Sequence, residues 1–364
     1  MELQTITLGN VSKMKYGKMP QKDRITQIGL YPIYSGYRVV GYYDEYNIDK
    51  PQLVVVARGV GGTGDVKISP PKCYLTNLSI SVELNEDIVL KEYLYYYFQI
   101  QNLRYLDSGS AQSQITIADL QRVEIPVPDM RCQKKIISIL KSLDEKIGVN
   151  EMINRNLQEQ AVAIYKEMIL DSAEELCSIG KLSDVAVITM GQSPKGDTYN
   201  EAGNGAVFYQ GRGEFGWRFP TRRLFTTEPK RMATINDVLI SVRAPVGDVN
   251  VAYEECCIGR GLGAIHSKDN HQSYVLYTVL SLKEKFEVFN GEGTVFGSIN
   301  RDGLNNMEII IPPARVRDSF EELVSPIDKM IKSNYEEIIR LTELRDALLL
   351  KLMSGELDVS DLDI

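Results

Sequence analysis

The chain has 364 residues, of which 43% are hydrophobic and 25% charged, and its formal net charge is −8. This length predicts two or three domains with packed cores. No segment approaches the roughly 18 consecutive apolar residues of a membrane helix, and the N-terminus has no signal-peptide core, so we expect a soluble, cytoplasmic protein. The five cysteines form no paired framework, which predicts reduced thiols.

Residues 1–128 are predicted to form a mixed α/β domain. A strand is expected at 53–59, a helix at 91–103 whose aromatic residues favour core packing over base stacking, and a strand at 123–128 that ends in proline. The glycines of GVGGTG (59–64), at 59, 61 and 64, match a dinucleotide-binding pattern. A strand rather than a helix is expected to follow them, which favours a turn.

Basic side chains cluster around Gly17 in the first domain. They are candidates for a phosphate-facing loop, and the alternative is a solvated basic turn. The members of this cluster are Lys13, Lys15, Lys18, Lys22 and Arg24.

Apolar residues recur alternately three and four apart through residues 131–170. The stripe starts at Ile136, Leu140, Leu143 and Ile147, is interrupted by Asn150 and Asn154, and resumes at Leu157, Ala161, Ile164 and Met168. This spacing predicts a coiled-coil seam with two polar members.

The second half of the chain repeats the first. The seam returns at 320–352 with Asn334 in its middle, residues 109–128 align with 293–313, and residues 8–20 align with 182–194. We therefore predict a first domain at 1–128, a long helix at 129–173, a second domain at 174–313, and a second long helix with a C-terminal tail at 314–364. Pro326 lies inside the second seam, where proline is expected to kink the helix or shift its start.

Arginines and aromatic residues interleave in GRGEFGWRFPTRRLF (211–225) of the second domain. Arginine is the usual bidentate reader of guanine and also holds phosphates, so this segment is a candidate DNA-reading loop. The alternative is that its arginines pair with acids of their own domain. Arg58 and Arg243 end corresponding strands, and each is a candidate ligand contact or a local salt-bridge partner.

No catalytic constellation is evident. With two histidines, His266 and His271, and no Cys-x-x-Cys, a zinc site is not expected. There is no G-x-S-x-G, P-loop or H-E-x-x-H motif. The nearest string to a DNA-methyltransferase tetrapeptide is residues 311–314, which we assign to a strand end. We expect a chain without cofactor, metal or enzymatic activity of its own.

The whole chain resembles the specificity subunits of Type I restriction-modification systems. The resemblance rests on the internal duplication, on the Ile-Pro-x-Pro strand end that runs into a long helix, and on the strings at 125–161 and 344–357. It implies an α+β fold with two mixed α/β target-recognition domains joined by two helices in an antiparallel coiled coil with a pseudo-twofold repeat. Each domain would read one half of a split, asymmetric site on double-stranded DNA.

The resemblance also implies partners. Two modification (methyltransferase) subunits would dock around the helices, and restriction (translocase and endonuclease) subunits would join them. Adenine methylation and ATP-dependent cleavage of DNA would belong to these partners. The alternatives are the recognition region of a self-contained restriction-methylation enzyme and a coiled-coil interaction protein without DNA affinity.

Two sets of residues follow from these expectations. The expected DNA-binding residues are Lys13, Lys15, Lys18, Lys22, Arg24, Arg58, Gln112, Gln114, Lys195, Arg212, Trp217, Arg218, Arg222, Arg223 and Arg243. The expected helix-pairing residues are Leu140, Leu143, Ile147, Asn150, Leu157, Val324, Ile327, Ile331, Asn334 and Leu341. Full antiparallel overlap predicts that Asn150 lies beside Asn334 and that the tail GELDVSDLDI returns to the first domain.

Overall fold

The chain folds into two compact units in the computed structural model, which describes residues 1–59, 62–107, 113–171, 177–290 and 297–362. The N-terminal unit comprises residues 1–149 and 337–364, and the C-terminal unit comprises residues 150–336. The long helices α3 (Met130–Tyr165) and α9 (Ala314–Ser354) each pass from one unit into the other. Each unit therefore contains one globular domain and a part of both helices. The domain boundary expected at 173 and 174 lies outside the described residues.

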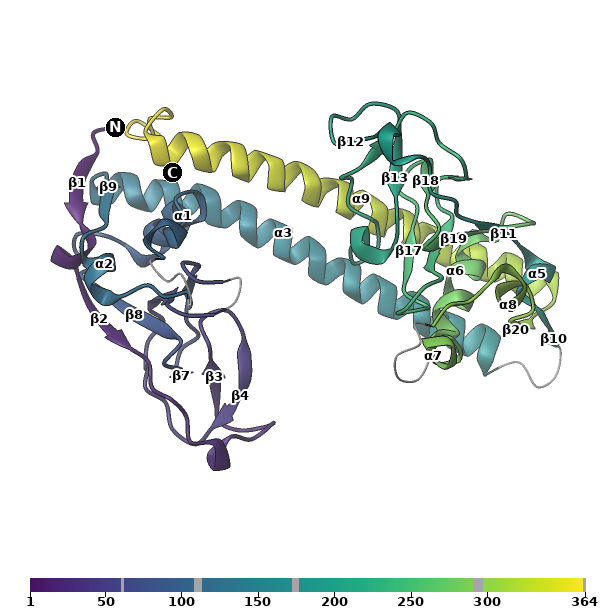
Figure 1. Ribbon diagram of the computed structural model, residues 1–364, viewed down its shortest axis with the longest axis horizontal. Coiled ribbons are helices and arrows are strands. Elements are labelled where there is room, and N and C mark those ends of the chain that lie inside the picture. The colour runs from purple at the N-terminus through teal and green to yellow at the C-terminus, as the bar shows by residue number, and fades with distance from the viewer. Residues whose placement is uncertain (60–61, 108–112, 172–176, 291–296, 363–364) are drawn as a thin grey trace. The chain divides into compact units, whose positions relative to one another are not determined.

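The globular part of the N-terminal unit mixes strands with short helices (Figure 1). Its strands are β1 (Gln4–Thr7), β2 (Ser12–Tyr16), β3 (Tyr31–Tyr34), β4 (Val39–Tyr43), β5 (Leu53–Val56), β6 (Val66–Ile68), β7 (Tyr74–Leu75), β8 (Ser79–Leu84) and β9 (Glu124–Val127). Its helices are α1 (Lys91–Ile100) and α2 (Ile117–Gln121). The strands form three sheets with the orders β2-β8-β5-β6, β4-β3-β7 and β1-β9.

The expected tyrosine-rich helix is α1, and its aromatic residues serve the core. Tyr93, Tyr96 and Phe98 are buried in one cluster with apolar residues of β5 and β8, which confirms the core-packing interpretation. The strand expected at residue 53 is β5, whose four residues are fully buried.

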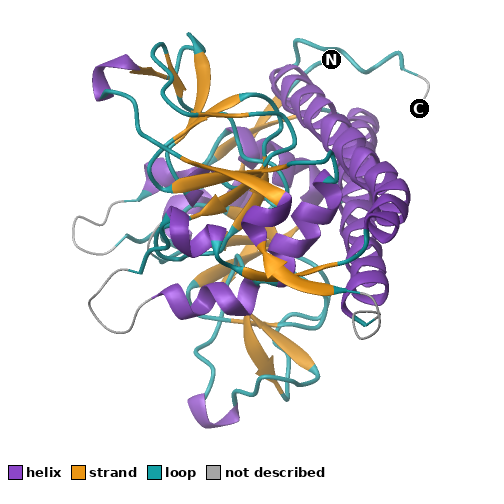
Figure 2. Ribbon diagram, turned by 90° about the vertical axis from the view of Figure 1, so that its right-hand side faces the viewer, coloured by secondary structure: helices purple, strands orange, loops and turns teal. Residues whose placement is uncertain are grey.

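The C-terminal unit repeats this design. Its strands are β10 (Ser178–Lys181), β11 (Ala186–Met190), β12 (Tyr199–Asn200), β13 (Ala206–Tyr209), β14 (Phe225–Thr226), β15 (Met232–Ala233), β16 (Val238–Ser241), β17 (Val249–Val251), β18 (Cys256–Ile258), β19 (Leu262–Ser267) and β20 (Glu308–Ile311). Its short helices are α5 (Leu182–Val185), α6 (Gln272–Ser281), α7 (Lys283–Glu287) and α8 (Arg301–Asn305). The sheet orders are β11-β19-β16-β17, β12-β14-β13-β18-β15 and β10-β20. The colouring in Figure 2 shows the mixture of strands and helices.

The two units share several equivalent connections. The first strand of each repeat pairs antiparallel with the strand that leads into the long helix, β1 with β9 and β10 with β20. The described part of the glycine-rich segment, at 59 and 62–64, lies between antiparallel strands β5 and β6, as expected for a turn, and Gly61 lies outside the described residues. Gly64 in this turn and Gly247 in the corresponding turn both have a positive φ, of 93° and 94°. Glycine adopts this backbone conformation without strain.

The long helices run antiparallel in each unit. In the N-terminal unit Arg345 meets Asp144 and Glu337 meets Lys146, so the sequence number rises on one helix as it falls on the other. In the C-terminal unit the ring of Tyr165 lies 5.7 Å from that of Phe320, and Asn154 contacts Asn334, so the direction is again opposite. Helix α9 continues through Pro326, so the proline does not move the start of the helix. At the end of α3, residues Lys166–Leu170 form a π-helical turn.

The register of the two helices differs from the expected one. Asn334 Nδ2 donates to Oδ1 of Asn154 at 2.9 Å, so its partner is Asn154 rather than Asn150. Asn154 Nδ2 in turn donates to the carbonyl oxygen of Ile331 at 3.2 Å. Because the apolar residues of a seam recur every three or four positions, a displacement of one helical turn still matches apolar with apolar residues. Asn150 is buried in its own right.

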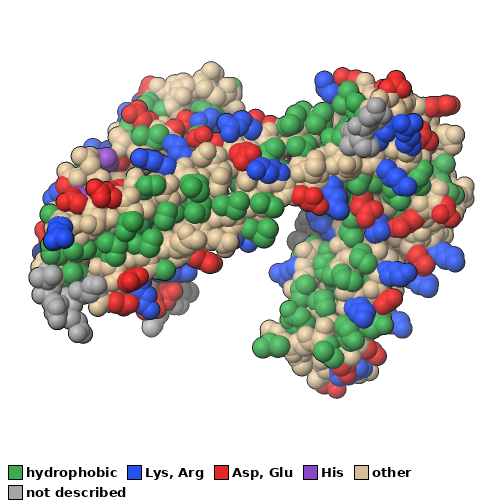
Figure 3. Space-filling model, turned by 180° about the vertical axis from the view of Figure 1, so that it is seen from behind, with side chains coloured by type: hydrophobic (Ala, Val, Ile, Leu, Met, Phe, Trp, Pro, Cys, Tyr) green, Lys and Arg blue, Asp and Glu red, His purple; other side chains and the backbone are tan. Residues whose placement is uncertain are grey.

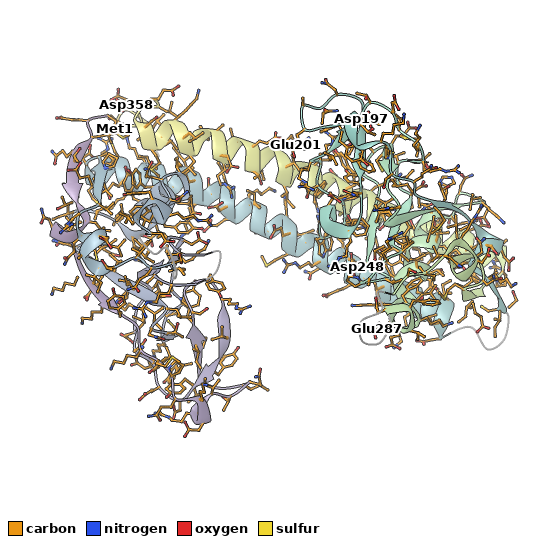
Figure 4. All side chains as sticks on the ribbon, in the orientation of Figure 1. Met1, Asp197, Glu201, Asp248, Glu287 and Asp358 are labelled. Carbon is orange, nitrogen blue, oxygen red and sulfur yellow. The ribbon has the colours of Figure 1, made fainter. Side chains whose placement is uncertain are left out.

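The C-terminal tail returns to the N-terminal unit, as expected. Lys135 Nζ on α3 donates to the carbonyl oxygens of Val359, at 3.0 Å, and Ser360, at 2.8 Å. Val359 is fully buried in the core of that unit. The amino group of Met1 pairs with the carboxylate of Asp358 beside this tail (Figure 4).

Candidate nucleic-acid interface

The basic cluster of the N-terminal unit starts on the edge strand β2. Lys13 and Lys15 are exposed on one face of this strand, whereas Met14 between them packs against the core. Lys15 lies opposite Ser81, Ser81 opposite Val54, and Val54 opposite Lys67 on β6. Residues paired across strands point to the same face. Lys67 is thus a further cation on this face of the sheet. The sequence did not predict it, because the face to which Lys67 points follows only from the register of the strands.

A close backbone contact fixes the turn that follows β2. A Cβ atom on Gly17 would lie 2.2 Å from the carbonyl oxygen of Thr76, so a larger residue is excluded here. The next amide, of Lys18, donates to the carbonyl oxygen of Leu75 at 2.9 Å. The exposed side chain of Lys18 therefore projects from a rigid turn, and the exposed Lys22 follows in a short 3-10 helix.

Arg24 differs from the four lysines because its charge is already paired. Its guanidinium contacts Asp44 at 2.5 Å and Glu45 at 3.6 Å and lies 4.5 Å from the centre of the Tyr43 ring. The hydrogen bond from Arg24 lowers the pKa of Asp44. Arg24 is thus tied to its own domain, whereas Lys13, Lys15, Lys18 and Lys22 form no ion pair with any residue that the structure describes.

Arg58 and Arg243 occupy equivalent places. Each is exposed at the end of a buried strand and forms a single β-bridge, Arg58 with Gln114 and Arg243 with Ser298. In both units the hydrogen bond next to the bridge recurs, from the amide of Ile115 to Ala57 and from that of Ile299 to Val242, both at 3.0 Å. Gln114 is half-buried, and Gln112 lies outside the described residues.

Residues 211–225 of the C-terminal unit, which we name the arginine loop, carry most of its candidate contacts. Three exposed arginines of the loop each pair with a carboxylate of the same unit. The pairs are Arg212 with Asp248 at 2.9 Å, Arg222 with Glu254, and Arg223 with Glu214 at 3.0 Å. The expected alternative of internal pairing is therefore realised for these residues.

These exposed pairs leave the loop available for ligands. The side chains of Arg212, Arg222 and Arg223 are 48%, 53% and 67% exposed. Exposed ion pairs contribute only about 0–1 kcal/mol, so a phosphate or a base edge can compete for such a guanidinium. Trp217 is 48% exposed on the same loop. Lys195, on a separate loop after β11, is also exposed.

Arg218 does not belong to the exposed set. Its side chain is 5% exposed, and its guanidinium pairs with Asp328 on α9. Alternation along the loop turns the side chain of Arg218 inward, against the long helix, while its neighbour Trp217 points to solvent. Among the expected DNA contacts of this loop, Arg218 is therefore the one whose side chain is buried.

Acidic residues lie among the candidate cations. Figure 3 shows Lys and Arg side chains interspersed with Asp and Glu on the visible face, rather than gathered in one basic patch. Figure 4 labels Asp197, Glu201 and Asp248 on the C-terminal unit, and Asp248 pairs with Arg212 of the arginine loop. Local clusters, rather than net charge, would provide any attraction for DNA.

The predicted helix-pairing residues face inward. Leu140, Asn150, Val324 and Ile331 are buried, and the other six of the set are half-buried. Apart from the changed partner of Asn334, these burials agree with the expected seam.

Other site classes find no support in the described parts of the chain. Among those residues no group of three or more His, Cys, Asp or Glu side chains is arranged to hold a metal ion. No described helix is both long enough and apolar enough to cross a membrane. The five cysteines are unpaired.

The fold and its internal repeat define a protein with two similar globular domains, each packed with parts of two long helices. A model of the family described as Type I restriction modification DNA specificity domain matches residues 1–159 and 175–342. The chain belongs to this family. The two matched ranges correspond to the two halves of the internal repeat.

Individual relatives agree with this assignment. The chain is 31% identical over 288 residues to a Methanocaldococcus jannaschii protein assigned as the specificity subunit of type I restriction enzyme MjaX, with 73% of this chain and 67% of the relative covered. It is 26% identical over 323 residues to the specificity subunit of type I restriction enzyme MjaIX from the same organism, with 79% and 74% covered.

A solved structure shows the same fold. The crystal structure of a Type I restriction-modification S subunit from M. genitalium aligns with a TM-score of 0.69 at 20% identity, covering 97% of this chain and 96% of that one.

Proposed function

We propose that each globular domain reads one half of a split DNA site and that the two halves differ in sequence. The observation that carries this proposal is one fold present twice with non-equivalent exposed side chains. Lys13 and Lys15 on β2 have Val187 and Thr189 as their counterparts on β11, which pairs in the same way with β19. The side chains that a domain presents decide which bases and phosphates it contacts, so two domains with different exposed residues are expected to select different sequences.

The proposed contacts of the two domains also differ in kind. In the N-terminal unit the exposed lysines are suited to phosphates as flexible point charges. In the C-terminal unit the arginine loop offers planar guanidinium groups, which bind guanine edges in a bidentate manner. Arg58 and Arg243, at equivalent strand ends, would contact DNA in both domains. Arg218 is left out of this set because it is buried.

The long helices would set the distance between the two half-sites. Helix α3 has 36 residues, which corresponds to about 54 Å at about 1.5 Å per residue. This exceeds the roughly 34 Å of one DNA turn, so both domains could reach successive grooves. A rigid pair of helices would therefore fix the number of base pairs in the spacer.

The same helices would bind two modification subunits. Several large apolar side chains are exposed on them, including Met152 at 58%, Leu323 at 55% and Met330 at 52%. Leu323 and Met330 stand seven residues apart and so share one face of α9, where exposed apolar side chains would suit a protein interface. DNA methylation and ATP-dependent cleavage would then be carried out by the modification and restriction partners, and the purified chain alone should show neither methyltransferase nor nuclease activity.

Domain exchange tests the proposal. Residues 1–128 are replaced by the corresponding domain of another family member, and the chimera is expressed with its modification subunits. Methylome sequencing should then show one changed half of the methylated motif and one unchanged half. If both halves change, or neither does, the assignment of one half-site to each domain is wrong.

A binding experiment separates this function from that of an interaction protein without DNA affinity. Retention of random-sequence duplex on a filter, repeated across salt concentrations, should fall steeply as salt rises. Retention near zero at low salt would contradict DNA binding.

A further inference from the structure

A tyrosine, an aspartate and an arginine meet in the N-terminal unit. Tyr96 of α1 donates its hydroxyl proton to Asp144 Oδ2 of α3 at 2.7 Å. Arg345 of α9 donates from Nη1 to the other carboxylate oxygen of Asp144 at 3.0 Å. Burial, together with the neighbouring Asp144 carboxylate, raises the pKa of Tyr96, which keeps the hydroxyl as a donor. This group joins the recognition domain to both long helices, and we name it the N-terminal node.

An equivalent group exists in the C-terminal unit, and we name it the C-terminal node. Tyr277 of α6 donates to Asp328 Oδ1 of α9 at 2.9 Å, and Arg218 pairs with the same carboxylate. Asp328 stands at the same offset from Asp144 as Leu304 does from Leu120 in the repeat. The second tyrosine pair agrees, because Tyr93 donates to the carbonyl oxygen of Pro126 at 2.8 Å and Tyr274 to that of Ile310 at 2.6 Å.

The arginine is the part of the node that is not repeated. The residue of α3 that corresponds to Arg345 of α9 is Ala161, which is fully buried and has no charge. The guanidinium of the C-terminal node comes instead from Arg218 in the arginine loop. Its Nη1 also lies 3.4 Å from Oε1 of Gln158 on α3.

Because Arg218 takes the place of a helix arginine, the arginine loop is attached to the long helices. Phe219, next in sequence, is buried and packs against Tyr253 and against Tyr335 of α9, with ring centres 5.7 and 4.8 Å away. The backbone carbonyl of Arg218 accepts a hydrogen bond from the amide of Val251 at 2.9 Å. The side chains of Arg218 and Phe219 thus both point inward. The exposed Trp217 precedes them in the loop, and the exposed Arg222 follows them.

Burial decides which ion pairs of the loop can be exchanged for a ligand. The exposed pairs are screened by water, so a phosphate can compete for their guanidinium groups. The pair of Arg218 and Asp328 is shielded, with side chains 5% and 20% exposed, and each charge has lost most of its water. Removing one partner would leave the other without compensation, so this contact persists when DNA binds.

We propose that Arg218 is a positioning residue, which holds the arginine loop on α9 through Asp328 so that its exposed side chains meet one half-site in a fixed orientation. This inference rests on the proposed function of the C-terminal domain. Arg345 makes the equivalent structural contact in the N-terminal unit, but from a helix, so it does not orient a loop.

The test compares variants of the two nodes in the full chain assembled with its modification subunits. Arg218→Ala removes the buried partner of Asp328, and Arg345→Ala is the matched control that removes the partner of Asp144. Thermal melting reports stability, and methylome sequencing reports the selectivity at each half-site. Both variants should melt at lower temperature, and Arg345→Ala by the smaller amount, because the side chains of Arg345 and Asp144 are 28% and 33% exposed. Only Arg218→Ala should lower selectivity, by about tenfold or more at positions of one half-site, as expected for a misplaced base contact.

A rescue variant separates positioning from stability. Ala161→Arg in the Arg218→Ala background offers Asp328 a guanidinium from α3, at the place that Arg345 occupies in the repeat. It should restore the melting temperature without restoring half-site selectivity. Arg218→Lys keeps the positive charge but loses the planar guanidinium group, so it should give intermediate half-site selectivity. This variant provides a test that does not depend on the rescue variant.

Three outcomes would overturn the inference: full selectivity in Arg218→Ala, full selectivity in the rescue variant, or relaxed selectivity in Arg345→Ala. A failure of the proposed function is recognised separately. In that case the wild-type complex would methylate no bipartite motif, or domain exchange would change neither half of it.

Discussion

The amide pair between Asn154 and Asn334 provides a quantitative test of how the helices keep their register. We predict that replacing both residues by leucine raises stability but loosens the register. Asn154 is 2% exposed and makes both of its described hydrogen bonds to α9. A buried polar pair of this kind specifies one alignment at a cost in stability.

The expected magnitudes follow from these contacts. A single Asn334→Ala change leaves Oδ1 of Asn154 buried without its donor, which should cost about 1–3 kcal/mol. The double leucine variant leaves no amide unsatisfied and adds apolar burial of about 1.5–3 kcal/mol for a fully buried side chain. Its net effect should be a gain of about 1–3 kcal/mol. For a unit of this size the melting temperature should rise by roughly 2–4 °C for each kcal/mol.

Two measurements check this prediction. A double-mutant cycle by thermal or denaturant unfolding should give a coupling energy of about 0.5–3 kcal/mol between the two positions. Methylome sequencing of cells that carry the double leucine variant should reveal methylated sites with altered spacer lengths. A double variant less stable than either single variant, or an unchanged spacer in a stabilised protein, would refute the register argument.

Three further predictions concern single side chains. If Arg222 or Arg223 contacts a base, its replacement by alanine should weaken DNA binding by about 1–3 kcal/mol and relax the selectivity at one half-site. If it contacts a phosphate, the replacement should weaken binding to all sequences and lower the salt slope by about one. Unchanged affinity in both variants would assign these residues to internal pairing. Burial opposes protonation of His271, but its contacts with the carboxylates of Asp269, at 2.9 Å, and Asp318, at 2.8 Å, outweigh this effect and raise its pKa. Protonated His271 therefore stabilises the folded state fully below the unfolded-state pKa of about 6.5, and this stabilisation is lost as pH rises through the folded-state pKa. The free energies of unfolding of wild type and His271→Gln should differ more at pH 5 than at pH 8. Tyr93→Phe should lower the free energy of unfolding by about 1 kcal/mol through loss of its hydrogen bond to Pro126, and an unchanged value would show that this bond contributes nothing net.

The secondary-structure elements and the duplicated design could be predicted from the sequence. The heptad seam predicted α3 and α9, and the apolar run at residues 53–56 predicted a buried strand, because periodicity and burial are written in neighbouring residues. Antiparallel helices and the return of the tail also followed, since two equivalent helices on one chain admit few arrangements. The repeat alone placed Arg58 and Arg243 at equivalent strand ends.

The partners of individual side chains could not be predicted, because they depend on how the folded chain packs. The seam pattern allows registers that differ by one helical turn, and packing chose Asn154 rather than Asn150 as the partner of Asn334. Within the arginine loop, composition could not distinguish Arg218, which is buried against Asp328, from the exposed Arg222. Whether an arginine of this loop is buried or exposed depends on a carboxylate far away in the sequence. Such a long-range contact exists only after the chain has folded.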